Sequence, residues 1–314
     1  MSALSELSTL ARQRRTPGMP KVKRRHKDNK SALLFLGPWF IGLLLITAVP
    51  LMSSLYFSFT DFDLLSPAKW IGVKNYVAMF HDQHWWKSVE VTFTYVFIAI
   101  PLELAFALGL ALALDKGIRG LAIYRSIYYL PSLLGGSVAI AVLWRQVFGR
   151  QGLVNDVLSW FGIQGLGWVA NPQTALGTLI VLGVWTFGSP MIIFLAGLRQ
   201  IPQMYYEAAE VDGAGRWTQF WRITFPLLTP IIFFNLVLQM IHAFQSFTGA
   251  FIVSGGTGGP ADSTLFYTLY LYREGFGSLK MGYASAMAWF LLIIIAVFTG
   301  LMFYFSKYWV HYDD

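Results

Sequence analysis

Long uncharged apolar stretches are the feature that most constrains the fold of this chain. A helix that crosses a bilayer needs about 20 consecutive, mostly apolar residues. Six stretches meet that requirement, and only one of them contains an acid, Glu103. We expect the spans at about residues 32–58, 91–114, 126–146, 174–198, 227–253 and 281–306.

These stretches favour helices over the strands of a membrane barrel. Barrel strands are short segments of alternating polarity, whereas these runs are continuous and rich in Leu, Ile and Phe. Within lipid a continuous apolar segment must satisfy its own backbone amides, which a helix does. Only 12% of the residues are charged, against roughly 25% in soluble domains. The sequence therefore predicts an all-α membrane protein with six transmembrane helices, and the absence of cysteine excludes disulfides and thiolate chemistry.

Lysine and arginine predict the orientation of the spans. Residues 1–31 form a basic tail, which we expect in the cytoplasm because cytoplasmic segments carry the excess of Lys and Arg. With six spans, 16 of the 23 basic residues then lie inside and seven outside, the outer ones being Lys69, Lys74, Lys87, Arg145, Arg150, Arg273 and Lys280. Both termini would be cytoplasmic. The tail is interpreted as a topology determinant and lipid anchor, since a basic run beside a span suits anionic lipid better than nucleic acid.

The loop of residues 199–226 is the most informative segment. Pro202 suits the start of a short helix, and Gly213 and Gly215 are placed to end it. A second short helix with three aromatic residues would then lead to Pro226 and the fifth span. Two short helices joined by a glycine turn would form a compact knob that fits a cleft of another protein. The simpler alternative is a connecting loop that lies on the lipid headgroups.

The order of residues in this loop resembles a known motif. Glu207-Ala208-Ala209, three further residues, Gly213, nine further residues and Ile223-Thr-Phe-Pro226 follow one another without a gap. The pattern resembles the EAA loop of the membrane subunits of bacterial ATP-binding-cassette (ABC) importers, in which the last element is I-x-L-P. The stretches Thr257-Gly-Gly-Pro and Gly282-Tyr-Ala-Ser-Ala are similar to the carbohydrate-uptake branch of that family, the maltose, glycerol-phosphate and multiple-sugar type. Ser54-Leu-Tyr-Phe-Ser-Phe-Thr60 is similar to the first of its two permeases.

The resemblance implies a fold, a function and a set of partners. The fold would be a type I ABC importer transmembrane domain over residues 32–310. The chain would be the permease of a binding-protein-dependent importer of a sugar, oligosaccharide or sugar-like solute in the bacterial cytoplasmic (inner) membrane. Its partners would be a second permease, an ATPase dimer and an extracytoplasmic solute-binding protein. The loop would couple to the ATPase through Glu207, Ala208, Ala209, Asp212, Gly213, Ile223 and Pro226.

The chain itself is expected to be neither an enzyme nor a nucleotide-binding protein. It lacks the G-x-x-x-x-G-K-[ST] pattern of a phosphate-binding loop, so ATP and Mg would be bound by the partner ATPase and the chain would carry no cofactor. Two alternatives remain at this stage. One is a secondary transporter driven by an ion gradient, for which we find no internal repeat, and the other is an ABC importer permease for a non-sugar solute.

The fifth span carries a polar stripe that is a candidate substrate path. Asn235, Gln239, His242 and Ser246 fall within about 60° of one helix face, with Gln245 beside them and Leu236 and Leu238 expected on other faces. Polar groups in hydrocarbon are costly unless they are paired or wet. The stripe therefore either lines a solvated path or forms interhelical hydrogen bonds. The further candidates for an aromatic and polar path surface are Trp185, Ser189 and Trp289.

Two other groups have simpler interpretations. Glu103 within the second span suggests either a proton relay or an internal hydrogen bond, and the second is favoured because no relay partner is evident. His81, Asp82 and His84 have metal-like spacing, but no further ligand lies nearby in the sequence. We therefore predict no metal site.

Overall fold

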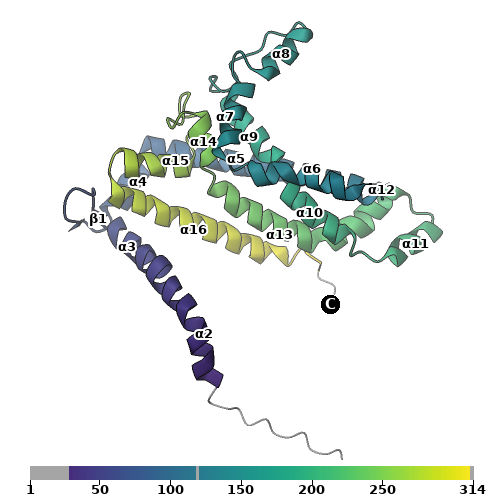
Figure 1. Cartoon of the computed structure of the whole chain (residues 1–314), viewed down its shortest axis with the longest axis horizontal. Helices are drawn as coiled ribbons and strands as arrows, with labels where there is room; N and C mark the ends of the chain where they lie inside the picture. The colour runs from purple at the N-terminus through teal and green to yellow at the C-terminus, as the bar shows by residue number, and fades with distance from the viewer. Residues whose placement is uncertain (1–27, 118–119, 312–314) are drawn as a thin grey trace, which may run out of the picture. The chain divides into compact units, whose positions relative to one another are not determined.

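The computed structural model describes residues 28–117 and 120–311 (Figure 1). Most of the predicted basic tail lies outside them. The chain divides into two units, residues 1–53 and 54–314. In the first unit, α2 (Asp28–Gly42) continues into the π-helical η1 (Leu43–Ala48) and the start of α3 (Val49–Ser58). Large apolar side chains along this run, such as Phe35 and Ile46, are exposed, as expected of a helix that meets lipid.

The second unit is almost wholly helical. Its only strands among the described residues are β1 (Thr60–Asp61) and β2 (Lys69–Trp70), which pair antiparallel with Thr60 opposite Trp70. The helices before residue 199 are α4 (Lys74–His81), α5 (Gln83–Asp115), α6 (Leu121–Leu134), α7 (Val138–Val147), α8 (Leu153–Trp160), α9 (Ala175–Trp185) and α10 (Gly188–Leu198). Those that follow are α11 (Gln203–Val211), α12 (Arg216–Gln219), η2 (Phe220–Thr224), α13 (Phe225–Phe244), α14 (Thr248–Val253), α15 (Tyr267–Tyr272), η3 (Arg273–Gly277) and α16 (Met281–Ser306).

Helix α5 is the centre of this unit and packs on α9, α10, α13 and α15. Its 33 residues correspond to about 50 Å of helix, so it extends beyond the predicted span of 91–114. Asp82 caps its first turn by accepting a hydrogen bond from the backbone N–H of His84 at 2.9 Å. The alanines Ala99, Ala107 and Ala111 are buried along α5, and their small size allows the neighbouring helices to approach closely.

Among the described residues, four helices are long and apolar enough to cross a membrane, and up to six spans result if each of two bent helix pairs counts as one. The first pair, α6 and α7, bends by 95° at Gly135, Gly136 and Ser137, and the Ser137 hydroxyl caps α7 by accepting from Ile140 N–H at 3.3 Å. The second pair, α9 and α10, bends by 41° at Thr186 and Phe187. The number of spans thus agrees with the sequence, although two of them are broken helices.

Candidate functional site

A cavity of about 500 Å³ opens between α5, α6, α9, α10, α13 and α14. This volume lies within the range of small-molecule sites. Its wall combines apolar side chains with polar groups from several helices. The polar and titratable residues of the wall are Tyr95, Glu103, Ser132, Thr186, Ser189, Asn235, Gln239, His242, Gln245, Ser246 and Thr248.

The polar residues of the fifth span all reach this cavity. Asn235 is 1% exposed, and its side-chain amide donates to the carbonyl of Ile231 one turn earlier at 3.1 Å. Gln239 is partly buried, whereas His242 and Gln245 are exposed. The structure therefore brings the stripe together on one wall, but Leu238 also lines the cavity. The expectation that Leu238 faces elsewhere is wrong, because position 238 lies about one helical turn before 242 and only about 40° from it around the helix.

The lining also contains polar groups that the sequence did not assign to the substrate path. Glu103 of α5 is 6% exposed and lines the cavity, and it belongs to none of the ion pairs found among the described residues. Ser132 of α6 donates to the carbonyl of Thr186 at 2.6 Å and accepts from the backbone N–H of Ser189 at 2.8 Å. The bend between α9 and α10 frees these backbone groups, so Ser132 joins α6 to the break. The sequence did contain a signal for Glu103, because it is the one acid within an apolar span.

The three further candidates from the fourth and sixth spans are separated by the structure. Ser189 lines the cavity, but neither Trp185 nor Trp289 belongs to its wall as described. The ring of Trp185 instead lies 5.8 Å from that of Trp144. Trp144 in turn donates from its indole N–H to the carbonyl of Thr178 at 2.9 Å. Trp185 thus packs between helices, which is the ordinary role of tryptophan in a helix bundle.

The loop of residues 199–226 folds into two short helices joined by a left-handed turn. Helix α11 begins directly after Pro202, and Gly213 follows it with φ of 77°, a conformation that glycine adopts without a steric penalty. Ala214 N–H then donates to the carbonyl of Ala209 at 2.8 Å and closes the helix end. The Tyr206 and Thr224 hydroxyls are 2.9 Å apart, which joins α11 to η2.

The outer surface of this loop mixes acids with large apolar side chains. Glu207, Glu210 and Asp212 are exposed. Val211 is 89% and Trp217 73% exposed, so the surface of the loop offers apolar as well as charged groups for contact. In Figure 1 the loop lies beyond the end of α13 that η2 joins, and α14 and α15 lie at the other end. The cavity and the loop therefore lie toward opposite ends of α13.

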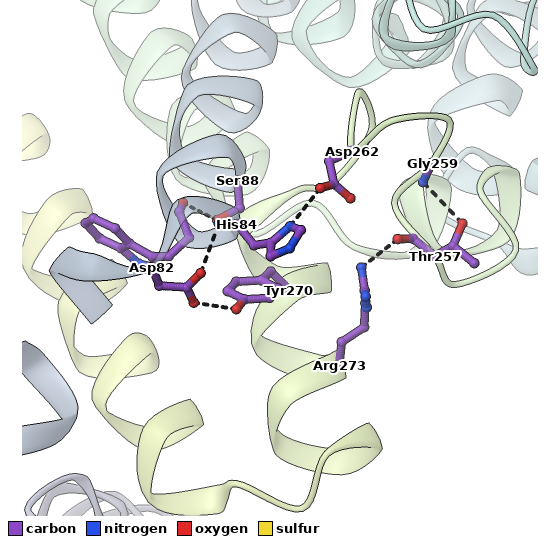
Figure 2. A network of polar contacts seen from close by, with 9 residues as sticks. Asp82, His84, Ser88, Thr257, Gly259, Asp262, Tyr270 and Arg273 are labelled. Atoms are coloured by element: carbon purple, nitrogen blue, oxygen red, sulfur yellow. Dashed lines mark hydrogen bonds and ion pairs between the residues drawn. The ribbon is translucent and has the colours of Figure 1, made fainter. Parts of the chain in front are cut away.

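A polar network ties three segments together near the start of α5 (Figure 2). The carboxylate of Asp82 accepts hydrogen bonds from the hydroxyls of Tyr270 and Tyr283, the second at 2.8 Å. Burial opposes ionisation of this carboxyl, but the hydrogen bonds that it accepts prevail and lower its pKa. His84 contacts Asp262 at 2.8 Å. The ring of His81 lies outside this network, 2.8 Å from the carbonyl of Val77, and the described residues hold no group of three or more side chains that could bind a metal ion.

Comparison with known proteins places these features in a family. Residues 76–310 match the family model described as "Binding-protein-dependent transport system inner membrane component". The chain is 52% identical to the probable ABC transporter permease protein YesP of Bacillus subtilis, over 94% of this chain and 96% of that protein. It is 31% identical to the lactose transport system permease protein LacF of Rhizobium radiobacter, over 93% of this chain and 98% of that protein.

A solved structure shares the fold. The structure is that of a bacterial alginate ABC transporter in complex with an alginate pentasaccharide-bound periplasmic protein, and one of its chains superimposes with a TM-score of 0.78 at 24% identity. The match covers 90% of this chain and 95% of the other. The helical fold of this chain is therefore shared with a chain of a solved ABC transporter.

Proposed function

This chain belongs to the family of binding-protein-dependent transport system inner membrane components, and from that premise we propose that it is the permease of an ATP-driven importer of a sugar, oligosaccharide or sugar-like solute. Membership of this family argues against a secondary transporter driven by an ion gradient. The sugar class is supported by the loop sequences near Thr257 and Gly282 and by the likeness to a lactose permease.

One observation carries the proposal: a single helical run connects the exposed loop to the cavity. From Arg216 the chain passes through α12, η2 and α13 to Phe244 without leaving helical geometry. The first part of this run belongs to the loop, and Gln239 and His242 near its end line the cavity. A displacement of the loop is thereby transmitted to the cavity wall, since a packed helix moves as a body.

In this proposal the cavity forms part of the translocation path. A sugar presents many hydroxyls, and Asn235, Gln239 and His242 offer donors and acceptors at one wall. Ser189, Gln245 and Ser246 extend the same polar surface. Hydrogen bonds to such groups replace those to water at a small net gain of about 0.5–1.5 kcal/mol each, which suits a site that must both accept and release its solute.

The loop forms the coupling surface in this proposal, through Glu207, Ala208, Ala209, Asp212, Gly213, Ile223 and Pro226. A partner ATPase dimer binds ATP and Mg, and its closure moves α11 and with it α13. A second permease completes the path, and a solute-binding protein delivers the solute from outside. Both termini lie in the cytoplasm, and the alternating-access cycle follows from opening the cavity to either side in turn.

The test is charge reversal on the coupling surface. We expect Glu207→Lys to leave the protein in the membrane but to reduce co-purification of the ATPase and solute uptake by at least about tenfold, because the reversed charge no longer complements the partner. The control is Asp156→Lys, which reverses an exposed helical acid on α8, far along the chain from the loop. Normal uptake and normal ATPase capture by Glu207→Lys would refute the coupling role.

A further inference from the structure

A second cavity, of about 690 Å³, lies apart from the path and is strongly basic. Arg145 comes from the last turn of α7 and Arg150 from the segment that follows it. Neither arginine belongs to an ion pair among the described residues, and the lining of this cavity contains no Asp or Glu. Both arginines are exposed, and because a guanidinium stays charged at all relevant pH values, they give the cavity a net positive charge.

The walls of this cavity are held in place by hydrogen bonds. The side-chain amide of Asn155 donates to the carbonyls of Arg150 at 3.0 Å and Leu166 at 2.8 Å, while its oxygen accepts from the indole N–H of Trp168 at 2.6 Å. One asparagine thereby joins the segment of Arg150 to the segment of Leu166, and both segments line the cavity. The cavity is organised before any ligand arrives, which lowers the entropic cost of binding.

The remaining wall is the loop that follows α14, visible in Figure 2. The hydroxyl of Thr257 accepts from Gly259 N–H at 3.2 Å, and a guanidinium N–H of Arg273 donates to the carbonyl of Thr257 at 2.6 Å. A third arginine, Arg273, thus holds this loop through its backbone. Two acids on neighbouring segments have partners of their own, since Asp262 contacts His84 and Glu274 contacts Lys280.

We infer that this cavity binds the anionic group of a carbohydrate, a carboxylate for instance, before the solute enters the path. The inference rests on the proposed function, since the six-span orientation places the cavity on the outer side. Lys and Arg are disfavoured in outer loops, so two of them around one cavity indicate a specific use. Arginine pairs with planar carboxylates through two parallel hydrogen bonds.

The size and remaining lining favour a sugar over an acidic side chain of a partner protein. A single carboxylate side chain would occupy a small part of about 690 Å³. The Asn171 amide and the backbone of Gly149, Gly165 and Gly167 also line the cavity, and these groups suit the hydroxyls of a sugar ring. Helix α14 links the two cavities, since Thr248 and Ala250 line the path whereas Val253 lines the basic cavity.

The test compares two sugars that share a ring and differ in charge. Ala170→Cys places a fluorophore at the rim of the cavity in a chain that has no cysteine of its own. The full chain in lipid nanodiscs is titrated with galacturonate and with galactose at equal ionic strength. We expect a saturable response to galacturonate and binding of galactose weaker by about tenfold or more, since a hydrogen bond to a charged group is worth that factor.

Variants of Arg145 and Arg150 then test whether these two residues bind the carboxylate. Arg145→Gln and Arg150→Gln should each weaken galacturonate binding by about tenfold or more, and the Lys variants should retain part of it, because lysine keeps the charge but not the paired geometry. Lys69→Gln removes an exposed charge elsewhere on the outer side and should change nothing. Thermal unfolding measurements check that each variant is folded. If a Gln variant is unfolded, the Lys variant at the same position is used for the comparison instead.

Three results would overturn the inference. These are equal binding of the two sugars, unchanged galacturonate binding in both Gln variants, and a loss of capture by the extracytoplasmic binding protein with galacturonate binding intact. The last result would assign the arginines to a protein contact. The titration measures binding and does not require transport. The proposed function is tested separately, by co-purification of the ATPase with the Glu207→Lys variant of α11.

Discussion

At the scale of single residues, Asp82 joins segments that are distant in the sequence. One carboxylate caps α5 and accepts hydrogen bonds from Tyr270 and Tyr283. The sequence suggested a metal-like spacing at this point, because spacing reports which side chains are close along the chain. Sequence spacing does not report that Tyr270 and Tyr283, which are distant along the chain, approach the carboxylate of Asp82. These contacts make Asp82 a structural residue that joins three segments.

We predict that Asp82→Asn lowers the free energy of unfolding at pH 7 by about 1 kcal/mol, the net value of hydrogen bonds to a partly exposed carboxylate. The lowered pKa of Asp82 means that its contribution is present at neutral pH and is lost as the pH falls through the folded-state pKa, below the ordinary 3.8. The two proteins should therefore converge in acid. Unfolding curves against pH measure this.

The control for this prediction is Asp63→Asn. The pKa of Asp63 is also lowered, mainly by the backbone N–H of Ser66, but Asp63 is only partly buried and its hydrogen bonds remain within one turn. Its replacement should have little effect. An equal loss of stability in both variants, or none in Asp82→Asn, would show that the network does not hold the three segments together.

At the scale of elements, the sequence predicted where the helices run but not where they bend. Hydropathy reports the apolar length of a segment, and the stretches at 126–146 and 174–198 have the length of one span each. Their breaks at Gly135 and Thr186 depend on tertiary contacts, such as the hydrogen bonds of Ser132 with both sides of the second break. The fifth span was predictable in more detail, because its polar residues recur at helical spacing.

The close contact of α10 with α6 can be tested by adding one methyl group. A β-carbon at Gly188 would lie 2.3 Å from the carbonyl oxygen of Tyr128, a backbone atom that cannot rotate away. Gly188→Ala should therefore destabilise the protein by about 1–3 kcal/mol, as overpacking does. Gly177→Ala on α9 meets nothing within 4 Å and should be neutral or slightly stabilising. The measurement is thermal unfolding of the purified variants in detergent. Equal midpoints for the two variants would contradict the close contact between α10 and α6.

At the scale of the whole molecule, we expect charge asymmetry to set the orientation in the membrane. Four long helices and two bent pairs supply up to six spans, and an even number returns the chain to its starting side. We predict that a reporter fused after Lys30 or within 199–226 indicates cytoplasm, whereas one near Trp70 or Ala261 indicates the outside. A reversed result at any of these sites would invalidate the six-span orientation.

The central claim is that energy from the ATPase reaches the solute path through α13. Single cysteines at positions 239 and 242 should react with a small water-soluble thiol reagent, because both line the cavity, whereas a cysteine at Leu236 should react slowly. In the assembled transporter, ATP with Mg should change the reaction rate at 239 and 242 severalfold, and Glu207→Lys should abolish that change. Rates at 239 and 242 that stay constant while the ATPase turns over would contradict the account.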